Sequence, residues 1–229
     1  MAVVLSIETA TSVCSVAIHR DEMLIVSQEL FIDRSHSAHL NDCIGQLTKM
    51  AGLEFGDYNA IAVSKGPGSY TGLRIGTSTA KGLCYALDIP LIAINTLEAM
   101  AHETNRFNIR KALLCPMIDA RRMEVYCTII DHSGRILQPT QALVVEPDSF
   151  DRWLDDHELW LFGSGAAKTR DVLKSHPGLF HIDGVVSVAS SVGQLAMERY
   201  KKDQFEDIAY FEPFYLKDFI AKKPKIVKP

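Results

Sequence analysis

Two acidic residues and two glycine-rich turns are the groups in this sequence that could bind a nucleotide. Glu8 and Asp119 each end an apolar run that is typical of a buried strand. Each half of the chain also has a glycine turn after such a run, at 66–68 and at 163–165. Carboxylates can hold Mg²⁺, and backbone N–H groups before a helix can bind phosphates. The candidate nucleotide cleft therefore comprises Glu8, Gly66, Gly68, Asp119, Gly163 and Gly165.

The same residues have simpler interpretations, which remain open. Glu8 and Asp119 can end strands without binding any ligand. The turn at 66–68 lacks the Lys-Ser/Thr of a P-loop, and Pro67 has no N–H to offer a phosphate. His36 and His39 lie three apart and could face one way on a helix, but two histidines alone make a poor metal site. A polar helix start at a surface or an interface is the simpler interpretation of that pair.

The stretch from residue 60 to residue 87 has the clearest structural pattern. A short apolar strand at 60–63 ends at the glycine turn, and Ser69 then occupies the N-cap position of a helix over Tyr70–Leu87. Gly72 and Gly76 lie four apart on one stripe of that helix, where each costs about 1 kcal/mol relative to Ala. The pair indicates that another backbone approaches closely. That backbone could belong to the chain's own sheet or to another protein.

Composition limits the classes of function. The 229 residues carry a net charge of −4, so any RNA contact must be local or made through a partner. The five cysteines show no CxxC spacing, which argues against a disulfide framework and a structural zinc site. We expect neither a signal peptide nor a membrane span, and therefore a cytoplasmic protein. Residues 221–229 carry four lysines and are expected to form a disordered basic tail that could add contacts to RNA.

Hydrophobic periodicity predicts an internal repeat of strands and helices. In the first half we expect strands at 3–7, 13–18, 23–31, 60–63 and 89–94, with helices at 35–51 and 70–87. In the second half we expect strands at 112–118, 125–130, from 136, 159–162 and 185–188, with helices at 147–157 and 190–202. The repeat predicts an α/β fold of two similar lobes, 1–105 and 106–229, with mixed sheets flanked by helices. The last helix could instead pack back on the first lobe.

Several motifs in the first hundred residues identify a family. They are Ile7-Glu8-Thr9-Ala10, Cys14-Ser15-Val16-Ala17, Arg34-Ser35-His36-Ser37, the run GPGSYTGLRIG at 66–76, and Ala80-Lys81-Gly82-Leu83. With them the sequence resembles the TsaB family of tRNA threonylcarbamoyladenosine biosynthesis proteins, within the actin-like, Hsp70-like ATPase (ribonuclease H-like) fold group. The resemblance is dense over residues 3–100 and sparse afterwards.

The resemblance also implies what this chain lacks. The catalytic relative TsaD transfers a threonylcarbamoyl group to adenosine 37 of tRNAs that read ANN codons, and it holds a metal through two histidines. Thr96 and Met100 stand in this sequence where those histidines would be, and neither side chain suits a divalent metal. We therefore expect a pseudo-enzyme with no catalytic residue, no metal site and no cofactor of its own. ATP and a divalent metal would belong to the complex with its partner.

The family further implies a heterodimer with TsaD, formed by the helices at 35–51 and 70–87. The expected interface residues are His36, His39, Leu40, Ile44, Tyr70, Thr71, Gly72, Leu73, Arg74, Gly76 and Thr77. The same surface would form a homodimer when TsaD is absent. The ATPase TsaE is expected to act on the complex, and tRNA to be reached through it.

Two other classes of function remain alternatives. One is an independent ATPase or sugar kinase of the same fold, which would bind and hydrolyse ATP without a partner. The other is a metalloprotease-like protein, which would carry a stoichiometric metal ion. The residues at positions 96 and 100 and the lack of a second nucleotide signature count against the ATPase or kinase.

Overall fold

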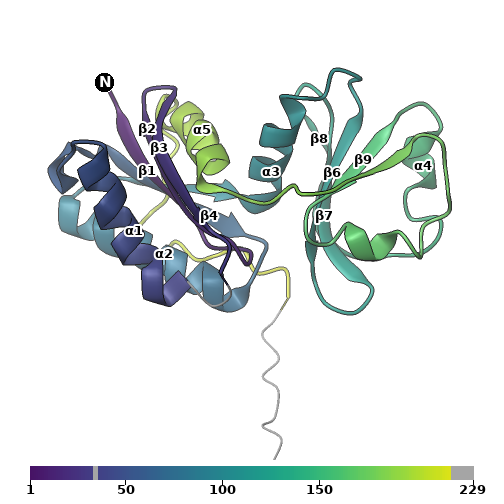
Figure 1. The fold of residues 1–229 in the computed structure, drawn as a ribbon, viewed down its shortest axis with the longest axis horizontal. Helices are drawn as coiled ribbons and strands as arrows, with labels where there is room; N and C mark the ends of the chain where they lie inside the picture. The colour runs from purple at the N-terminus through teal and green to yellow at the C-terminus, as the bar shows by residue number, and fades with distance from the viewer. Residues whose placement is uncertain (33–35, 218–229) are drawn as a thin grey trace, which may run out of the picture.

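The computed structural model describes residues 1–32 and 36–217 and divides them into two lobes, each built on a five-stranded sheet. Figure 1 shows the lobes side by side, with helices α3 and α5 between them. The expectations for Arg34 and Ser35 and for the tail at 221–229 concern residues outside those described. Among the described residues, no helix is both long enough and apolar enough to cross a membrane.

The first sheet has the order β3-β2-β1-β4-β5. Its strands are β1 Val3–Glu8, β2 Cys14–Arg20, β3 Met23–Leu30, β4 Ala60–Gly66 and β5 Leu91–Asn95. The short connections make β1, β2 and β3 antiparallel, whereas β4 runs parallel to both β1 and β5. β1 and β5 are buried at every residue because helices cover both faces of the sheet, and their sequences are correspondingly rich in apolar residues.

The second sheet repeats this arrangement in the order β8-β7-β6-β9-β10. Its strands are β6 Leu113–Asp119, β7 Glu124–Ile130, β8 Ile136–Val144, β9 Leu159–Phe162 and β10 Leu179–Ile182. The antiparallel and parallel pairings match those of the first sheet strand for strand. The predicted repeat and fold class are confirmed.

The strand predicted at 185–188 is wrong. The fifth strand of this sheet is β10, which lies six residues earlier and pairs in parallel with β9. Residues 185–188 form an extended connection that leads into a helix and leaves the second sheet. A short apolar segment has the sequence pattern of a strand whether or not it forms backbone hydrogen bonds with a neighbouring strand.

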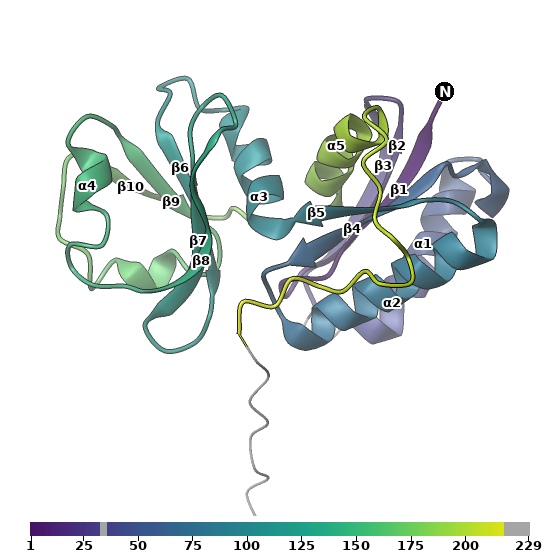
Figure 2. The same ribbon diagram turned by 180° about the vertical axis from the view of Figure 1, so that it is seen from behind.

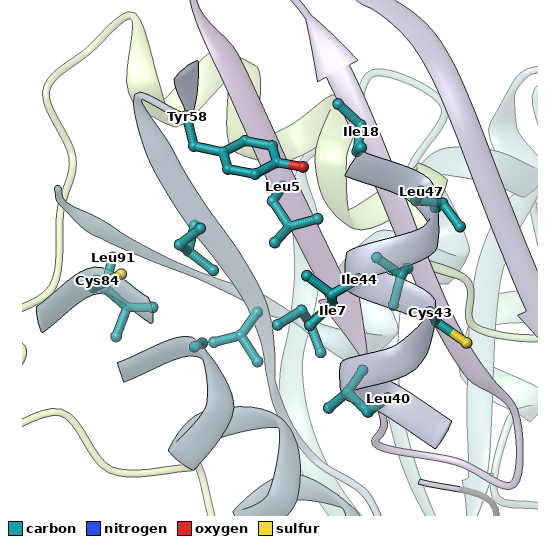
Figure 3. Close-up of a cluster of buried hydrophobic side chains, with 14 of the residues drawn as sticks. Leu5, Ile7, Ile18, Leu40, Cys43, Ile44, Leu47, Tyr58, Cys84 and Leu91 are labelled. Atoms are coloured by element: carbon teal, nitrogen blue, oxygen red, sulfur yellow. The ribbon is translucent and has the colours of Figure 1, made fainter. Parts of the chain in front are cut away.

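Helices α1 His36–Met50 and α2 Tyr70–Leu87 lie side by side on one face of the first sheet. Figure 3 shows Leu40, Ile44 and Leu47 of α1 pointing toward the strands, where they join the core around Leu5 and Ile7. The Ser69 side chain caps α2 by accepting a hydrogen bond from the Gly72 amide at 3.3 Å, as predicted. α2 ends at Asp88, whose backbone is left-handed.

The remaining helices differ from the sequence prediction. α4 covers only Asp151–Leu154, because the residues before it form turns, with the Glu146 amide bonded to the Ser149 hydroxyl. α3, Thr96–Asn105, was not predicted; it is capped by the Asn95 side chain, which accepts from the amides of Leu97 and Glu98. α5, Ala189–Tyr200, is close to its predicted position. Short 3-10 turns occur at Phe55–Asp57 and Ala167–Thr169.

The two lobes exchange helices. α3 follows the first sheet but packs on β6 of the second, whereas α5 follows the second sheet but packs on β1 and β2 of the first. Val192, Ala196 and Met197 of α5 therefore join a core cluster with first-sheet strands. Leu97 and Met100 of α3 join a cluster with second-sheet strands. The last helix does not complete the second lobe.

After α5 the chain forms a C-terminal strap, which we define as residues 203–217. The strap crosses the first lobe beside α2, as the yellow segment in Figure 2 shows. Its backbone bonds to β5 through the Glu206 amide and the Leu91 carbonyl at 2.9 Å, and to β4 through the Phe214 amide and the Lys65 carbonyl at 2.7 Å. Phe211 is buried in the core of the first lobe. The strap therefore belongs to the folded lobe.

Candidate functional site

The two glycines of α2 face the chain's own β1–β2 connection. A Cβ atom on Gly72 would lie 2.0 Å from the Thr9 carbonyl oxygen, and one on Gly76 would lie 2.3 Å from Thr9 Oγ1. Thr9 Oγ1 also donates a hydrogen bond to the Gly72 carbonyl at 2.8 Å. Of the two interpretations that the sequence left open, close packing within the chain is the one that the structure supports.

The residues predicted for the partner interface divide into two groups. Six of them have buried side chains or backbones in the described chain: Leu40, Ile44, Gly72, Leu73, Gly76 and Thr77. The other five are exposed or half-buried: His36, His39, Tyr70, Thr71 and Arg74. Leu40, Ile44 and Leu73 lie on the apolar side of each helix, and that side packs on the sheet. The prediction that these six residues lie on an exposed interface is therefore wrong, because they are part of the protein's interior.

The surface that α1 and α2 leave free is their outer face. We define this face as Ala38, Asp42, Gly45 and Lys49 of α1 with Thr71, Ser78, Gly82 and Tyr85 of α2. Gly45 and Gly82 have no atom within 4 Å of where a Cβ would lie, so the space above them is open. A helical wheel could have found Gly82, because it lies nine residues from the core residue Leu73 and nine residues rotate a helix by about half a turn.

Arg74 lies where α2 meets the strap. Its guanidinium lies 4.2 Å from the ring centroid of Tyr70 and forms a side-chain hydrogen bond with Tyr215. The Tyr70 and Tyr215 rings are 5.1 Å apart. About two turns further along α2, Lys81 Nζ donates to the Phe211 carbonyl at 3.1 Å and to the Ala209 carbonyl at 3.4 Å. The strap therefore fixes the side of α2 that borders the outer face, a role that the sequence did not reveal.

Glu8 lies in the interior and does not face a cleft. Its carboxylate is fully buried and accepts hydrogen bonds from Ser187 Oγ at 2.5 Å, Ser64 Oγ at 2.9 Å and the Ala10 amide at 2.5 Å. Burial raises the pKa of Glu8, and these hydrogen bonds oppose the rise without reversing it. The carboxylate ties β1 to β4 and to the segment that enters α5.

The remaining members of the candidate nucleotide cleft contact protein atoms. A Cβ on Gly66 would lie 2.8 Å from the Phe214 carbonyl of the strap, and one on Gly68 would lie 2.3 Å from the Ala10 carbonyl. A Cβ atom on Gly163 would lie 2.4 Å from the Met117 carbonyl oxygen, and a Cβ atom on Gly165 would lie 3.0 Å from the Ile118 carbonyl carbon. The glycines thus allow close approach of the chain to itself. This contact accounts for them without a phosphate.

Asp119 is exposed and pairs with Lys168. Partial burial would raise the pKa of Asp119, but the hydrogen bond and charge of Lys168 hold that pKa below its usual value. Within residues 1–32 and 36–217, no group of three or more His, Cys, Asp and Glu side chains could hold a metal ion. Glu8 and Asp119 therefore do not form a magnesium site with other described acids.

The two positions where the relative's histidines would stand lie on the buried side of α3, and Thr96 is the first residue of that helix. Thr96 and Met100 are buried, at 0% and 1% exposure. Met100 packs against Leu114 and Phe162, and its methyl carbon approaches Gly163 so closely that a Cβ there would lie 2.5 Å away. An apolar cluster therefore fills this place, and the residues do not fit a metal.

Comparisons with known proteins agree with this architecture. The model of the TsaD family, tRNA N6-adenosine threonylcarbamoyltransferase, matches residues 30–158. The TsaB protein of Escherichia coli, named for tRNA threonylcarbamoyladenosine biosynthesis, is 30% identical over 226 residues, which cover 96% of each chain. The TsaB protein of Bacillus subtilis is 33% identical over 135 residues, which cover 59% of this chain and 58% of that protein.

Solved structures share the fold. YeaZ from Pseudomonas aeruginosa superposes with a TM-score of 0.80 at 24% identity, over 94% of this chain and 100% of that chain. The activator of 2-hydroxyisocaproyl-CoA dehydratase from Clostridium difficile, with bound ADPNP, superposes with a TM-score of 0.54 at 11% identity. The match covers 88% of this chain and 97% of that chain. Fold, repeat and near full-length similarity agree, and the chain belongs to the TsaB/YeaZ family, which is related to TsaD and has an actin-like ATPase fold.

Proposed function

We propose that this chain is a non-catalytic subunit that binds and activates a TsaD-type transferase during threonylcarbamoyladenosine formation on tRNA. The observation that carries the proposal is the similarity to E. coli TsaB over 96% of both chains. The apolar packing of Thr96 and Met100 supports the absence of catalysis by this chain itself. The substrate would be adenosine 37 of tRNAs that read ANN codons, bound through the complex.

The outer face of α1 and α2 is the surface that supports partner binding. Its small residues leave room for another helix to approach, and Gly45 and Gly82 have open space above them. Two partner helices packed on this face would form a four-helix bundle and should bury more than about 1,000 Å² in total. Binding would shift the transferase toward its competent conformation.

The other components follow from this role. The same face would form a homodimer when the transferase is absent. ATP and a divalent metal would be held by the partner complex, on which a TsaE-type ATPase would act.

Gly82→Leu tests the proposal without disturbing the core. Because the space above Gly82 is open, the variant should fold with a melting temperature at or above that of the parent. Its side chain would fill the space meant for the partner helix. We expect loss of co-purification with the transferase and at least a tenfold loss of threonylcarbamoyl transfer to tRNA. Gly82→Ala is the matched control and should retain most of both.

Full activity and co-purification of Gly82→Leu would exclude the outer face as the interface. Modification of tRNA by the isolated chain, or ATP turnover without a partner, would show an independent enzyme. Isothermal titration calorimetry with ATP and Mg²⁺ makes that distinction on the purified chain, and elemental analysis shows whether it carries a stoichiometric metal ion.

A further inference from the structure

The contact between α5 and the first sheet is centred on His19 and Gly193. His19 lies on β2 and is fully buried. A Cβ atom on Gly193 would lie 2.2 Å from His19 Nδ1 and 2.9 Å from Ser6 Oγ. The backbone of α5 therefore lies directly against the imidazole ring, and any larger residue at position 193 would push the helix and the ring apart.

Several polar groups at this contact are buried without hydrogen bonds. Among the described residues, neither ring nitrogen of His19 has a hydrogen-bond partner, and the same holds for Ser6 Oγ and Ser191 Oγ. Apolar packing of Val192 and Ala196 on first-sheet strands opposes the cost of burying them. Because a buried polar group without a partner loses its hydration and gains nothing in return, the docking of α5 is weakened at this point.

No described charged side chain compensates a proton on this imidazole. Burial alone lowers the pKa of His19 from its ordinary value of 6.5 to about 4. The described ionisable side chains of the elements packed against His19, and of the turns beside them, neither bond to it nor shift its pKa: Glu8, Cys14, Arg20, Asp21, Glu22, Glu29, Glu198, Arg199, Tyr200 and Lys201. An imidazolium here would be buried without a counter-charge, which is much less favourable than a buried neutral ring.

We propose that His19 makes the docking of α5 on the first sheet sensitive to acid, so that protonation of its imidazole releases α5 while α1 and α2 stay in place. A released imidazole is hydrated and takes up the proton near pH 6.5, whereas the docked imidazole does so only near pH 4. The contribution of neutral His19 to docking is therefore fully present above pH 6.5 and is lost as pH falls toward 4. Because α5 follows the second sheet and covers the first, its release removes one tie between the lobes.

Glu8 acts on the same contact in the opposite direction. Its carboxylate accepts a hydrogen bond from Ser187, which leads into α5, and burial raises the pKa of Glu8. The stability that Glu8 contributes is therefore lost as pH rises through its folded pKa. Ionised Glu8 weakens the docking of α5 at high pH, and protonated His19 weakens it at low pH. This device belongs to the isolated chain, and its test needs neither the transferase nor tRNA.

The test is hydrogen exchange measured by mass spectrometry on the full chain at pH 5 and pH 7, with rates corrected for the intrinsic effect of pH on exchange. His19→Phe keeps a ring of similar size that cannot be protonated. Relative to this variant, the opening constant of α5 in the parent should rise about 20-fold between pH 7 and pH 5, which follows from the two pKa values of His19. Glu8 is present in both proteins, so its effect cancels.

His181→Gln is the matched control. It replaces a half-buried histidine of β10 whose pKa burial also lowers, but which lies in the second sheet and bonds to Thr169. Its α5 should respond to acid as that of the parent does. In all three proteins α1 and α2 should keep their protection at pH 5.

An equal response of α5 to acid in the parent and in His19→Phe would overturn the inference. So would an equal loss of protection in α1, α2 and α5 of the parent, since the chain would then unfold as a whole. If His19→Phe does not fold, NMR of the parent decides the question. Imidazole C–H signals of His19 that titrate near pH 6.5 while α5 stays protected would overturn the inference, whereas signals that stay neutral down to pH 5 would support it.

Discussion

At the scale of single residues, Glu8, the last residue of β1, and Thr9, which follows it, hold neighbouring elements against the strand. Glu8 accepts three hydrogen bonds and joins strands that lie 56 residues apart to a segment 179 residues away. The next residue, Thr9, meets both glycines of α2. The acid that the sequence offered as a magnesium ligand is therefore a buried structural group, because hydroxyl and amide donors already satisfy it.

Glu8→Gln should stabilise the protein at neutral and alkaline pH. A folded-state pKa above the unfolded value means that the carboxyl contributes most stability when protonated, and that this stability is lost as pH rises through the folded pKa. Glutamine keeps an acceptor for Ser64 and the Ala10 amide, and it offers a donor to Ser187. Thermal melts from pH 5 to pH 8 should show an advantage of the variant that grows with pH.

Glu8→Ala is the control for the hydrogen bonds themselves. It leaves two hydroxyls and an amide without their acceptor and should cost on the order of 3 kcal/mol at pH 5. The cost should shrink as pH rises, because the parent loses stability when the buried carboxyl ionises. A melting temperature of Glu8→Gln below that of the parent at pH 8 would show that the ionised carboxylate is needed for stability.

At the scale of elements, α2 has three functional sides. One side packs on the sheet and on Thr9, a second is held by the strap through Arg74 and Lys81, and the third is free on the outer face. The glycines divide between these sides. Gly72 and Gly76 admit the chain's own backbone, whereas Gly82 lies in the open.

Alanine substitutions should separate the two kinds of glycine. Gly72→Ala places a Cβ against the Thr9 carbonyl, which belongs to the backbone and must shift, so we expect a loss of about 2 kcal/mol. Gly82→Ala meets nothing and should gain up to about 1 kcal/mol from helix propensity. Urea unfolding measures both. Equal changes in the free energy of unfolding for the two substitutions would contradict the assignment of Gly72 to the packed side of α2 and of Gly82 to its free side.

At the scale of the whole molecule, the helix exchange makes each lobe depend on the other. The first sheet needs α5 from the end of the chain, and the second sheet needs α3 from the middle. The strap adds a further tie, since Lys217 pairs with Glu124 on β7. The repeats in the sequence are therefore similar units that do not correspond to independently covered sheets.

Separate halves of the chain should not fold alone. A fragment of residues 1–105 would expose Val4, Ala62, Ile92 and Ile94, which α5 covers in the intact chain. We expect each of the fragments 1–105 and 106–229 to lack a cooperative thermal transition by circular dichroism, and their mixture to regain one. The intact chain should unfold in a single transition. A fragment 1–105 that melts cooperatively near the temperature of the parent would refute this dependence.

Sequence reasoning succeeded where a pattern is local. The period of α2, its Ser69 cap and the buried run of β1 depend on neighbouring residues, and each matches the structure. It failed at β10 and α3. Pairing with β9 selects 179–182 over the equally apolar 185–188, and α3 gains its stability from a sheet that begins eight residues after the helix ends. For the candidate interface, the family resemblance implied the two helices α1 and α2, which stays a prediction, but which side of each helix is exposed depends on packing that the sequence does not specify.

Most of the strands and helices, the internal repeat and the family were determined by the sequence alone, because they follow from local periodicity and from a long specific motif. Which face of α2 is free, which lobe each helix covers, and where the strap crosses the first lobe were decided only by the tertiary structure. These features depend on contacts between residues up to 179 positions apart, such as that of Glu8 with Ser187, whose partners no local pattern specifies.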